Sequence, residues 1–222
     1  MKRYTLFFTS FNISVMSIGN ARNIVIHKIN TTREFLEINP NYGIEFDVRN
    51  NNGEICLSHN PIVNNVEVEP LEKLLQLCND NLLIANVKES GIEAQVISLI
   101  RNYSDNFFLL DCEMPYIINN YKTKGNYLSI RYSNLESINT VDNFINYIKW
   151  IWVDTYDEVD IKKLNNELYA NSKIVFVSPE RWDKEINIDE YIEKLRNKDA
   201  RIDFVMTDEN NAKSWENNFF NY

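Results

Sequence analysis

The feature that most constrains the fold is a regular alternation of short apolar runs with longer amphipathic stretches. Runs rich in β-branched and aromatic residues predict strands at residues 24–29, 43–48, 81–87, 106–111, 127–131, 150–154, 173–177 and 204–206. Amphipathic stretches between them predict helices at residues 70–78, 92–100, 115–121, 141–148, 159–168 and 188–195. Because strands that alternate with helices are typical of a parallel sheet, we predict an α/β fold.

The number of strands and the length of the chain narrow the architecture. The chain has 222 residues without a linker, repeat or low-complexity block, so we expect a single domain over residues 1–222. Eight alternating strands favour a (β/α)8 TIM barrel over an open doubly wound sheet, because no glycine-rich phosphate loop follows any strand. A hairpin-like extension is predicted at residues 54–58, after a turn at 50–53.

Residues 1–22 form an N-terminal extension of uncertain role. Lys2 and Arg3 precede an apolar stretch, so the segment loosely resembles a signal peptide. Polar residues such as Thr9 and Asn12 interrupt the apolar stretch. We therefore favour a segment that is retained.

The charge balance and the cysteines restrict partners and compartment. With 32 acidic against 23 basic residues, the net charge of −9 argues against a broad surface for nucleic acid or anionic membranes. No stretch reaches the roughly 20 apolar residues of a membrane helix, so no stable membrane insertion is expected. Cys56, Cys78 and Cys112 are an odd number without CxxC spacing, which predicts reduced thiols and a cytoplasmic location.

Polar residues cluster at the ends of the predicted strands, where a β/α barrel carries its catalytic groups. Glu45 and Asp47 share one face of their strand because side chains alternate. Two unpaired carboxylates in a barrel are unfavourable, so we expect a divalent cation, Mg²⁺ or Ca²⁺ rather than Zn²⁺. The alternative is an edge strand that turns both carboxylates to solvent.

The chain has two histidines, and they lie on either side of the carboxylate pair along the sequence. Two imidazoles near two acids suit hydrolysis of a phosphodiester, since one can activate a nucleophile and the other protonate the leaving alkoxide. A metal and Lys88 would neutralise the phosphoryl oxygens, and Lys28 could contact phosphate as a point charge. His27 and His59 are therefore the candidate catalytic residues.

Several motifs resemble those of the glycerophosphodiester phosphodiesterases, within the phospholipase C-like phosphodiesterase superfamily. The family pattern is His-Arg-Gly, then Gly-x-Glu-x-Asp-Val, Asp-Gly, His-Asp, Glu-x-Lys and a late Thr-Asp. The matching segments here are His27-Lys28, Gly43-Ile44-Glu45-Phe46-Asp47-Val48, Gly53, His59-Asn60, Asn86-Val87-Lys88 and Thr207-Asp208. Spider-venom sphingomyelinase D and phosphatidylinositol phospholipase C are similar more distantly.

The resemblance implies a β/α barrel that hydrolyses glycerophosphodiesters of lipid metabolism with a divalent metal. It implies that His27 and His59 are acid and base, that Glu45 and Asp47 bind the metal, and that Lys88 contacts phosphate. The chain departs from the pattern at Lys28, Ile29, Asn60 and Asn86. The last departure matters most, because an amide replaces the third acidic ligand and brings no charge, so metal affinity should fall unless Asp111 or Glu113 contributes.

The resulting set of site residues leaves several alternatives open. The predicted metal ligands are Glu45, Asp47, Asn86 and Asp111, and the predicted substrate contacts are Lys28, Lys88, Arg131 and Arg181. Asp111 and Glu113 could instead cap the helix that follows, and Arg131 could pair with Asp154. Residues 178–182 either line the site or begin an ordinary loop, with the loop favoured.

The leading hypothesis is metal-dependent hydrolysis of a small-molecule phosphodiester. One alternative is a noncatalytic barrel that binds a phosphorylated glycerol or sugar, which the amide at position 86 would explain. Another is a cyclising phospholipase-type lyase, in which a substrate hydroxyl attacks phosphorus.

Overall fold

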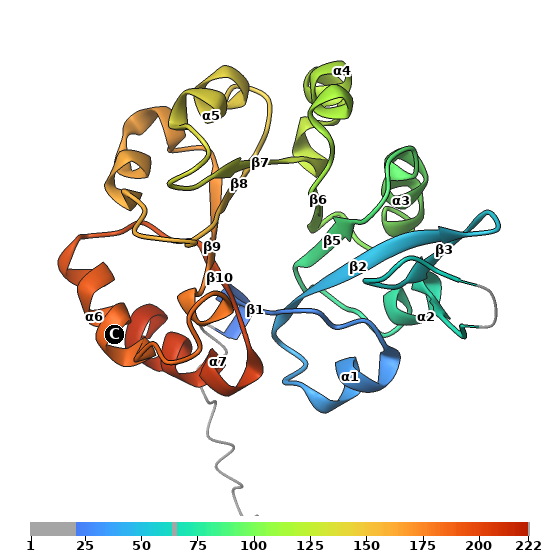
Figure 1. Cartoon of the computed structure of the whole chain (residues 1–222), viewed down its shortest axis with the longest axis horizontal. Coiled ribbons are helices and arrows are strands. Elements are labelled where there is room, and N and C mark those ends of the chain that lie inside the picture. The colour runs from blue at the N-terminus through green and yellow to red at the C-terminus, as the bar shows by residue number, and fades with distance from the viewer. Residues whose placement is uncertain (1–20, 64–65, 222) are drawn as a thin grey trace, which may run out of the picture.

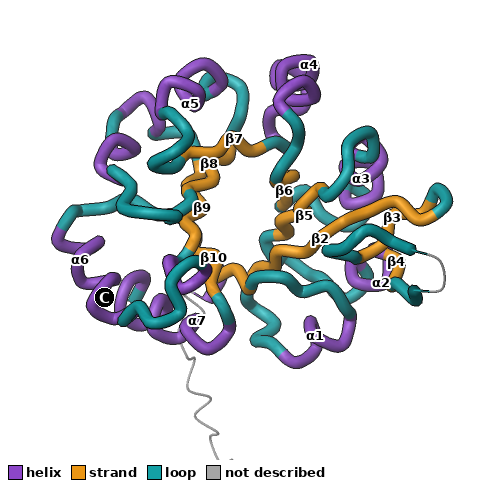
Figure 2. The backbone as a smooth tube through the Cα atoms, viewed as in Figure 1, coloured by secondary structure: helices purple, strands orange, loops and turns teal. Residues whose placement is uncertain are grey.

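The structure is a computed structural model that describes residues 21–63 and 66–221. Residues 1–20, which make up most of the N-terminal extension, lie outside the described residues, so the expected retention of that segment stays a prediction. In the described part, strands form a ring and helices lie around its outside (Figures 1 and 2).

Eight strands run parallel in this ring, and all eight predicted strands are confirmed. Their bounds are β1 (Ile24–Ile26), β2 (Gly43–Asn51), β5 (Leu83–Val87), β6 (Phe107–Leu110), β7 (Ser129–Tyr132), β8 (Trp150–Val153), β9 (Lys173–Val177) and β10 (Phe204–Thr207). Parallel ladders join β6 to β5, then β2, β1, β10, β9, β8 and finally β7. The fold is therefore α/β with a mostly parallel sheet, and it is TIM-barrel-like.

The expected closed barrel needs correction at the seam between β6 and β7. In the described residues these strands share one isolated parallel bridge, between Leu109 and Leu128, rather than a ladder. The hydroxyl of Ser129 adds a hydrogen bond to the carbonyl of Leu109, at 2.9 Å. Since this register places Leu110 opposite Ser129, most of β7 extends past the end of β6, and the ring stays open there (Figure 2).

A hairpin extends β2 beyond the ring, as predicted. Strand β3 (Glu54–Leu57) pairs antiparallel with the end of β2, and β4 (Glu69–Pro70) pairs with β3. The turn places Asn52 and Gly53 at φ values of 53° and 97°, a region that favours glycine. A hydrogen bond of 3.0 Å from the Ser58 N–H to the Asp47 carbonyl then returns the chain to the ring.

The helices lie outside the ring (Figure 2). The α-helices are α1 (Thr32–Glu37), α2 (Leu71–Leu75), α3 (Glu93–Ile100), α4 (Met114–Lys124), α5 (Ile138–Phe144), α6 (Ile188–Asn197) and α7 (Glu209–Trp215). The shorter helical segments are η1 (Ala21–Asn23), η2 (Gly125–Tyr127), η3 (Ile161–Asn165), η4 (Glu167–Tyr169), η5 (Pro179–Arg181) and the π-helical η6 (Glu216–Phe220). The α1 and α7 helices were not predicted.

The prediction of one helix at residues 159–168 was wrong. The structure has two 3₁₀ segments there, η3 and η4, separated at Asn166. The Asn166 side chain accepts a hydrogen bond from the Leu168 N–H at 2.9 Å. Because asparagine side chains compete with the backbone in this way, the helix is interrupted.

The interior of the ring is filled by large apolar side chains. Trp150 and Trp152 from β8 are each 3% exposed, and the Trp150 ring stacks on Phe108 with centroids 4.7 Å apart. The two tryptophans therefore belong to the core of the ring. A larger apolar cluster packs the outer face of the strands against the helices.

The helices and the cysteines of the described residues bear on the expected membrane insertion and thiol state. None of the helices there has the length and apolarity needed to cross a bilayer. All three cysteines are free thiols, and Cys56 is buried.

Candidate active site

The alternation of side chains along β2 places the carboxylate pair inside the ring. Glu45 and Asp47 are each 2% exposed, whereas Phe46 and Val48 point the other way into the outer core. Strand β2 lies between β1 and β5. The alternative of a solvent-facing edge strand is therefore excluded.

Both carboxylates accept hydrogen bonds, mainly from uncharged donors. Glu45 accepts from the backbone N–H of Lys28 at 2.8 Å and from Asn86 Nδ2 at 2.9 Å. Asp47 accepts from Asn30 Nδ2 at 2.7 Å, and its other oxygen lies 3.1 Å from Lys88 Nζ. Lys88 is thus the charged partner of the pair.

Lys28 contributes through its backbone rather than its ammonium group. Its φ is 60°, in the left-handed region that is unfavourable for residues other than glycine. The residue is exposed and its side chain does not line the cavity described below. The structure thus places this predicted phosphate contact outside the site.

His27, which follows β1, lies between two carboxylates. Its Nε2 is 3.8 Å from Glu45 Oε2, and its Nδ1 is 3.8 Å from Asp208 Oδ1. Burial, with a contribution from the nearby Arg181 charge, lowers the pKa of His27 to about 4 despite the acidic neighbours. The imidazole is therefore neutral at pH 7 and able to accept a proton.

The carboxylate next to His27 has a shifted pKa as well. Burial, reinforced by the charge of Asp47, raises the pKa of Glu45 to about 7. Without an added cation, Glu45 therefore holds its proton to higher pH than an ordinary glutamate does.

The hairpin brings His59 to the same place. His59 follows β3 and is exposed, and its Nδ1 lies 3.1 Å from Asn60 Oδ1. Its carbonyl accepts a hydrogen bond from Arg49 Nη2 at 3.1 Å, which fixes the backbone of this segment. The imidazole is therefore exposed, with its Nδ1 beside the Asn60 side chain.

A cavity of about 200 Å³ joins these groups at the carboxyl ends of the strands. Both histidines, the carboxylate pair and most other predicted site residues line it: His27, Glu45, Asp47, His59, Asn86, Lys88, Asp111, Arg131 and Arg181. Apart from Lys28, the structure brings all predicted site residues together.

The opposite wall of this cavity is an ion-pair cluster around Arg131 of β7. The guanidinium contacts Asp111, which follows β6, and Asp154, which follows β8. It also lies 3.0 Å from the Tyr156 hydroxyl, and Asp154 accepts from Trp152 Nε1 at 3.0 Å. The pairing of Arg131 with Asp154, which the sequence left open, is observed, together with its pairing with Asp111.

Glu180 is a buried glutamate that was not predicted as a site residue. It holds the turn that forms the third wall of the cavity. Glu180 is 4% exposed and accepts hydrogen bonds from Thr207 Oγ1 at 2.5 Å and from the Asp208 N–H at 3.2 Å. It also contacts the Ser178 hydroxyl. The turn after β9 is thereby tied to the Thr-Asp motif after β10. The available signal was an acidic residue three positions after the end of a strand.

The same turn places Arg181 and Trp182 on the cavity wall. The prediction that residues 178–182 begin an ordinary loop, rather than line the site, was therefore wrong. The Arg181 guanidinium lies 6.0 Å from the centroid of the Trp182 ring. Its side chain forms no hydrogen bond or ion pair with any residue in the described part of the chain. Arg181 is therefore available to an anionic ligand.

The donor groups around Glu45 fit a hard cation. Within the described residues, Asn86 Oδ1 is a buried side-chain atom without a hydrogen-bond partner. Together with the two carboxylates it supplies the oxygen donors that Mg²⁺ and Ca²⁺ prefer. No group of three His, Cys, Asp or Glu residues suited to a metal occurs in the described part, because the third donor here is an amide. The residues thus fit a site with two charged ligands.

Two further acidic residues lie away from this donor set. Asp111 is engaged by Arg131. Glu113 is the N-cap residue of α4 and does not line the cavity, and its side chain makes no capping hydrogen bond.

Comparison with known proteins identifies the fold. No protein-family profile and no curated protein sequence matches the chain. A glycerophosphodiester phosphodiesterase structure from Agrobacterium tumefaciens is similar, with a TM-score of 0.57 and 12% identity over 86% of this chain and 98% of that one. A glycerophosphoryl diester phosphodiesterase from Parabacteroides distasonis gives a TM-score of 0.62 and 12% identity over 87% and 84%. The chain has the fold of these phosphodiesterases.

A third structure extends the similarity over the whole phosphodiesterase fold. It is a second Agrobacterium tumefaciens protein assigned as a glycerophosphoryl diester phosphodiesterase, with a TM-score of 0.61 and 13% identity over 90% of this chain and 99% of that one. The likeness concerns architecture, and it confirms the barrel-like fold that the sequence motifs implied.

Proposed function

We propose that this protein hydrolyses a small-molecule phosphodiester, with a glycerophosphodiester as the first candidate. The observation that carries the proposal is the single cavity in which His27, His59 and the Glu45–Asp47 pair meet. It lies at the strand ends where barrel enzymes hold their catalytic groups. The structures of similar fold are described as glycerophosphodiester phosphodiesterases.

The two histidines divide the proton transfers. His27 is neutral at pH 7 and takes the proton from the attacking nucleophile. His59 sits on the exposed side of the cavity and protonates the leaving alkoxide. Asp208, 3.8 Å from His27 Nδ1, orients the first imidazole.

Glu45, Asp47 and Asn86 would hold a divalent metal, Mg²⁺ or Ca²⁺. When bound, such an ion supplies positive charge that stabilises the phosphoryl oxygens. We leave Asp111 out of the ligand set because Arg131 engages it. The cavity has one more carboxylate than cationic side chains, so an anionic substrate requires either this added charge or protonation of Glu45.

The chain's own cations bind the phosphodiester. Lys88, 3.1 Å from Asp47, faces the proposed metal site, and Arg181 offers a guanidinium fork from the other side. We also propose a cytoplasmic location, which the three free thiols support.

The direct test is turnover of glycerophosphocholine and bis(4-nitrophenyl) phosphate with Mg²⁺, Ca²⁺ or Mn²⁺, and with chelator. We expect metal-dependent release of phosphomonoester that is lost with chelator and in His27→Ala. Phosphorus NMR of the product separates the hydrolase from a cyclising lyase, since the lyase releases a cyclic phosphate.

The second candidate function is a noncatalytic barrel that binds a phosphorylated glycerol or sugar. It is favoured by the amide at position 86 and by the hydrogen bonds that already satisfy Glu45. Binding of glycerol phosphate without turnover under any metal condition would support it over the hydrolase.

A further inference from the structure

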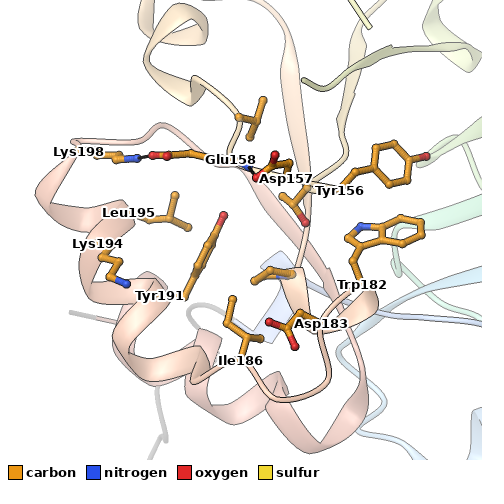
Figure 3. A pocket seen from close by; sticks show the side chains of 13 residues that line it. Tyr156, Asp157, Glu158, Trp182, Asp183, Ile186, Tyr191, Lys194, Leu195 and Lys198 are labelled. Carbon is orange, nitrogen blue, oxygen red and sulfur yellow. Dashed lines mark hydrogen bonds and ion pairs between the residues drawn. The ribbon is translucent and has the colours of Figure 1, made fainter. Parts of the chain in front are cut away.

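A second and larger cavity lies beside the proposed active site. Its volume is about 590 Å³, and it is formed by the segment after β8, the turn after β9 and helix α6 (Figure 3). Tyr156 and Trp182 line both cavities, with ring centroids 4.3 Å apart. This aromatic pair therefore forms the boundary between the two spaces.

The walls of the second cavity are largely apolar and aromatic. Tyr191 stands across the cavity from Trp182 and Tyr156 (Figure 3). Ile186 and Leu195 complete the wall on the side of α6. Trp182 and Tyr156 are 46% and 40% exposed, so much of each ring is available for contact.

The rim of the same cavity offers unused polar groups. One oxygen of Asp157 accepts from the Glu158 N–H at 2.7 Å, and one oxygen of Asp183 accepts from the Glu185 N–H at 3.0 Å. The second oxygen of each carboxylate and the Lys194 ammonium group form no hydrogen bond or ion pair with the described residues. Lys198 and Glu158, by contrast, pair with each other (Figure 3).

We propose that this second cavity binds a polyhydroxylated ring, such as a glycosyl group, carried by one alcohol of the phosphodiester. Such a ring has apolar faces that pack on Tyr191 and Trp182, and hydroxyl groups that reach Asp157, Asp183 and Lys194. An alkyl chain would leave these polar groups without partners, which is unfavourable on burial. An anionic group would meet more carboxylates than lysines.

The inference rests on the proposed function for the position of the phosphate. With the phosphodiester held by Lys88 and Arg181, one of its alcohols extends past Trp182 into the larger space. The second cavity would then select among diesters by the alcohol they carry.

Ring binding can be measured without turnover. Trp150, Trp152 and Trp215 are at most 3% exposed, so Trp182 is the tryptophan that acrylamide quenches. We expect myo-inositol and methyl α-D-glucoside to protect Trp182 from acrylamide in a saturable way. Tyr191→Ala should abolish protection, whereas Tyr147→Ala, at an exposed tyrosine that lines neither cavity, should retain it. If neither myo-inositol nor methyl α-D-glucoside protects Trp182 from acrylamide, the inference is overturned.

A kinetic comparison tests the same cavity at Trp182, whose side chain is 46% exposed. Trp182→Ala should lower the ratio of kcat/KM for glycerophosphoinositol to that for glycerophosphoethanolamine about tenfold, because the ring loses an aromatic face. An unchanged ratio would overturn the inference while leaving the hydrolase intact. Saturable protection of Trp182 without turnover of any diester would retain the cavity and refute the proposed function.

Discussion

The two sides of the site cavity stabilise buried carboxylates in different ways. On the side of β1, β2 and β5, Glu45 and Asp47 are held mainly by amide donors, and Lys88 is the single lysine or arginine of residues 21–63 and 66–221 in contact with them. On the side of β6 to β8, the Arg131 guanidinium contacts Asp111 and Asp154, and it lies 3.5 Å from Glu136. Among the described residues, Glu45 on the first side contacts no lysine or arginine, whereas each carboxylate of the second side contacts Arg131.

This difference separates chemistry from architecture within one cavity. A carboxylate held by neutral donors keeps its attraction for a cation. Burial and the charge of Asp47 raise the pKa of Glu45 to about 7, and burial also raises the pKa of Asp154 although Arg131 opposes that shift. A carboxylate in contact with a half-buried guanidinium, as Asp111 and Asp154 are, already has a counter-charge beside it. We therefore assign catalysis to the first side and support to the second.

The largest expected effect is on catalysis at the first side. His27→Ala and His59→Ala should each lower kcat about 10²- to 10⁴-fold, the usual contribution of general acid or base catalysis. Steady-state kinetics on a glycerophosphodiester measures this, with thermal unfolding as the control for folding. A loss below about fivefold in either variant would reassign that histidine to structure.

On the second side, the cluster around Arg131, we expect substitutions to lower the free energy of unfolding. Arg131→Met leaves Asp111 and Asp154 without their counter-charge, so the free energy of unfolding should fall by about 3 kcal/mol. Urea denaturation measures it, and Arg131→Lys, which keeps a charge, should recover part of the loss. A decrease smaller than about 1 kcal/mol would contradict a supporting role for this cluster.

A pH series probes the uncompensated charge of Glu45 in the presence of chelator. Because its folded pKa is about 7, against 4.5 for the ordinary group, native Glu45 keeps a proton that the unfolded chain has lost between these values. The free energy of unfolding therefore falls as pH rises through this window, and Glu45→Gln removes that fall.

Comparing the natural chain with Glu45→Gln isolates the contribution of Glu45 to the pH dependence of stability. The lowered pKa of His27 makes stability fall as pH drops below 6.5, and because both proteins contain His27, that effect is common to them apart from the part that Glu45, 3.8 Å away, contributes. The stability of Glu45→Gln relative to the natural chain should rise by up to about 3 kcal/mol between pH 4.5 and 8. A difference independent of pH would contradict the raised pKa.

Metal affinity should respond on the first side alone. Asn86→Asp adds a third charged ligand, so calorimetric titration with Ca²⁺ should show about tenfold tighter binding. Asp111→Asn is the matched control, and we expect little change because Arg131 already engages that carboxylate. Equal effects of the two substitutions would erase the distinction between the sides.

The smallest effect is expected at an exposed ion pair. Lys184 Nζ lies 2.7 Å from Asp208, and the lysine side chain is 61% exposed. Lys184→Met should change the free energy of unfolding by less than about 1 kcal/mol, as is usual for exposed pairs. If Lys184→Met lowers the free energy of unfolding as much as Arg131→Met does, burial is not what distinguishes the Lys184–Asp208 pair from the Arg131 cluster.

The sequence could predict those features that depend on local periodicity. Alternation along residues 43–48 placed Glu45 and Asp47 on one face and Phe46 on the other, because a strand has a period of two. The resemblance in motif order then placed His27 and His59 near that pair. These steps used spacing along single strands and turns.

Features that depend on long-range register were not predictable. Nothing in the local pattern indicates that Asn30 reaches Asp47, or that Glu180 ties two strand ends together. The exposure of Trp182 and the open seam also depend on how distant segments pack. Such contacts are set by tertiary geometry rather than by propensity.

The single bridge between Leu109 and Leu128 has a consequence for local stability. Backbone amides in a continuous ladder are released only when neighbouring strands separate cooperatively, whereas a lone bridge opens by itself. Deuterium uptake should therefore begin along the facing edges of β6 and β7, well before it reaches β2 and β5. The barrel would loosen first beside Asp111 and Arg131, the side that we assign to support.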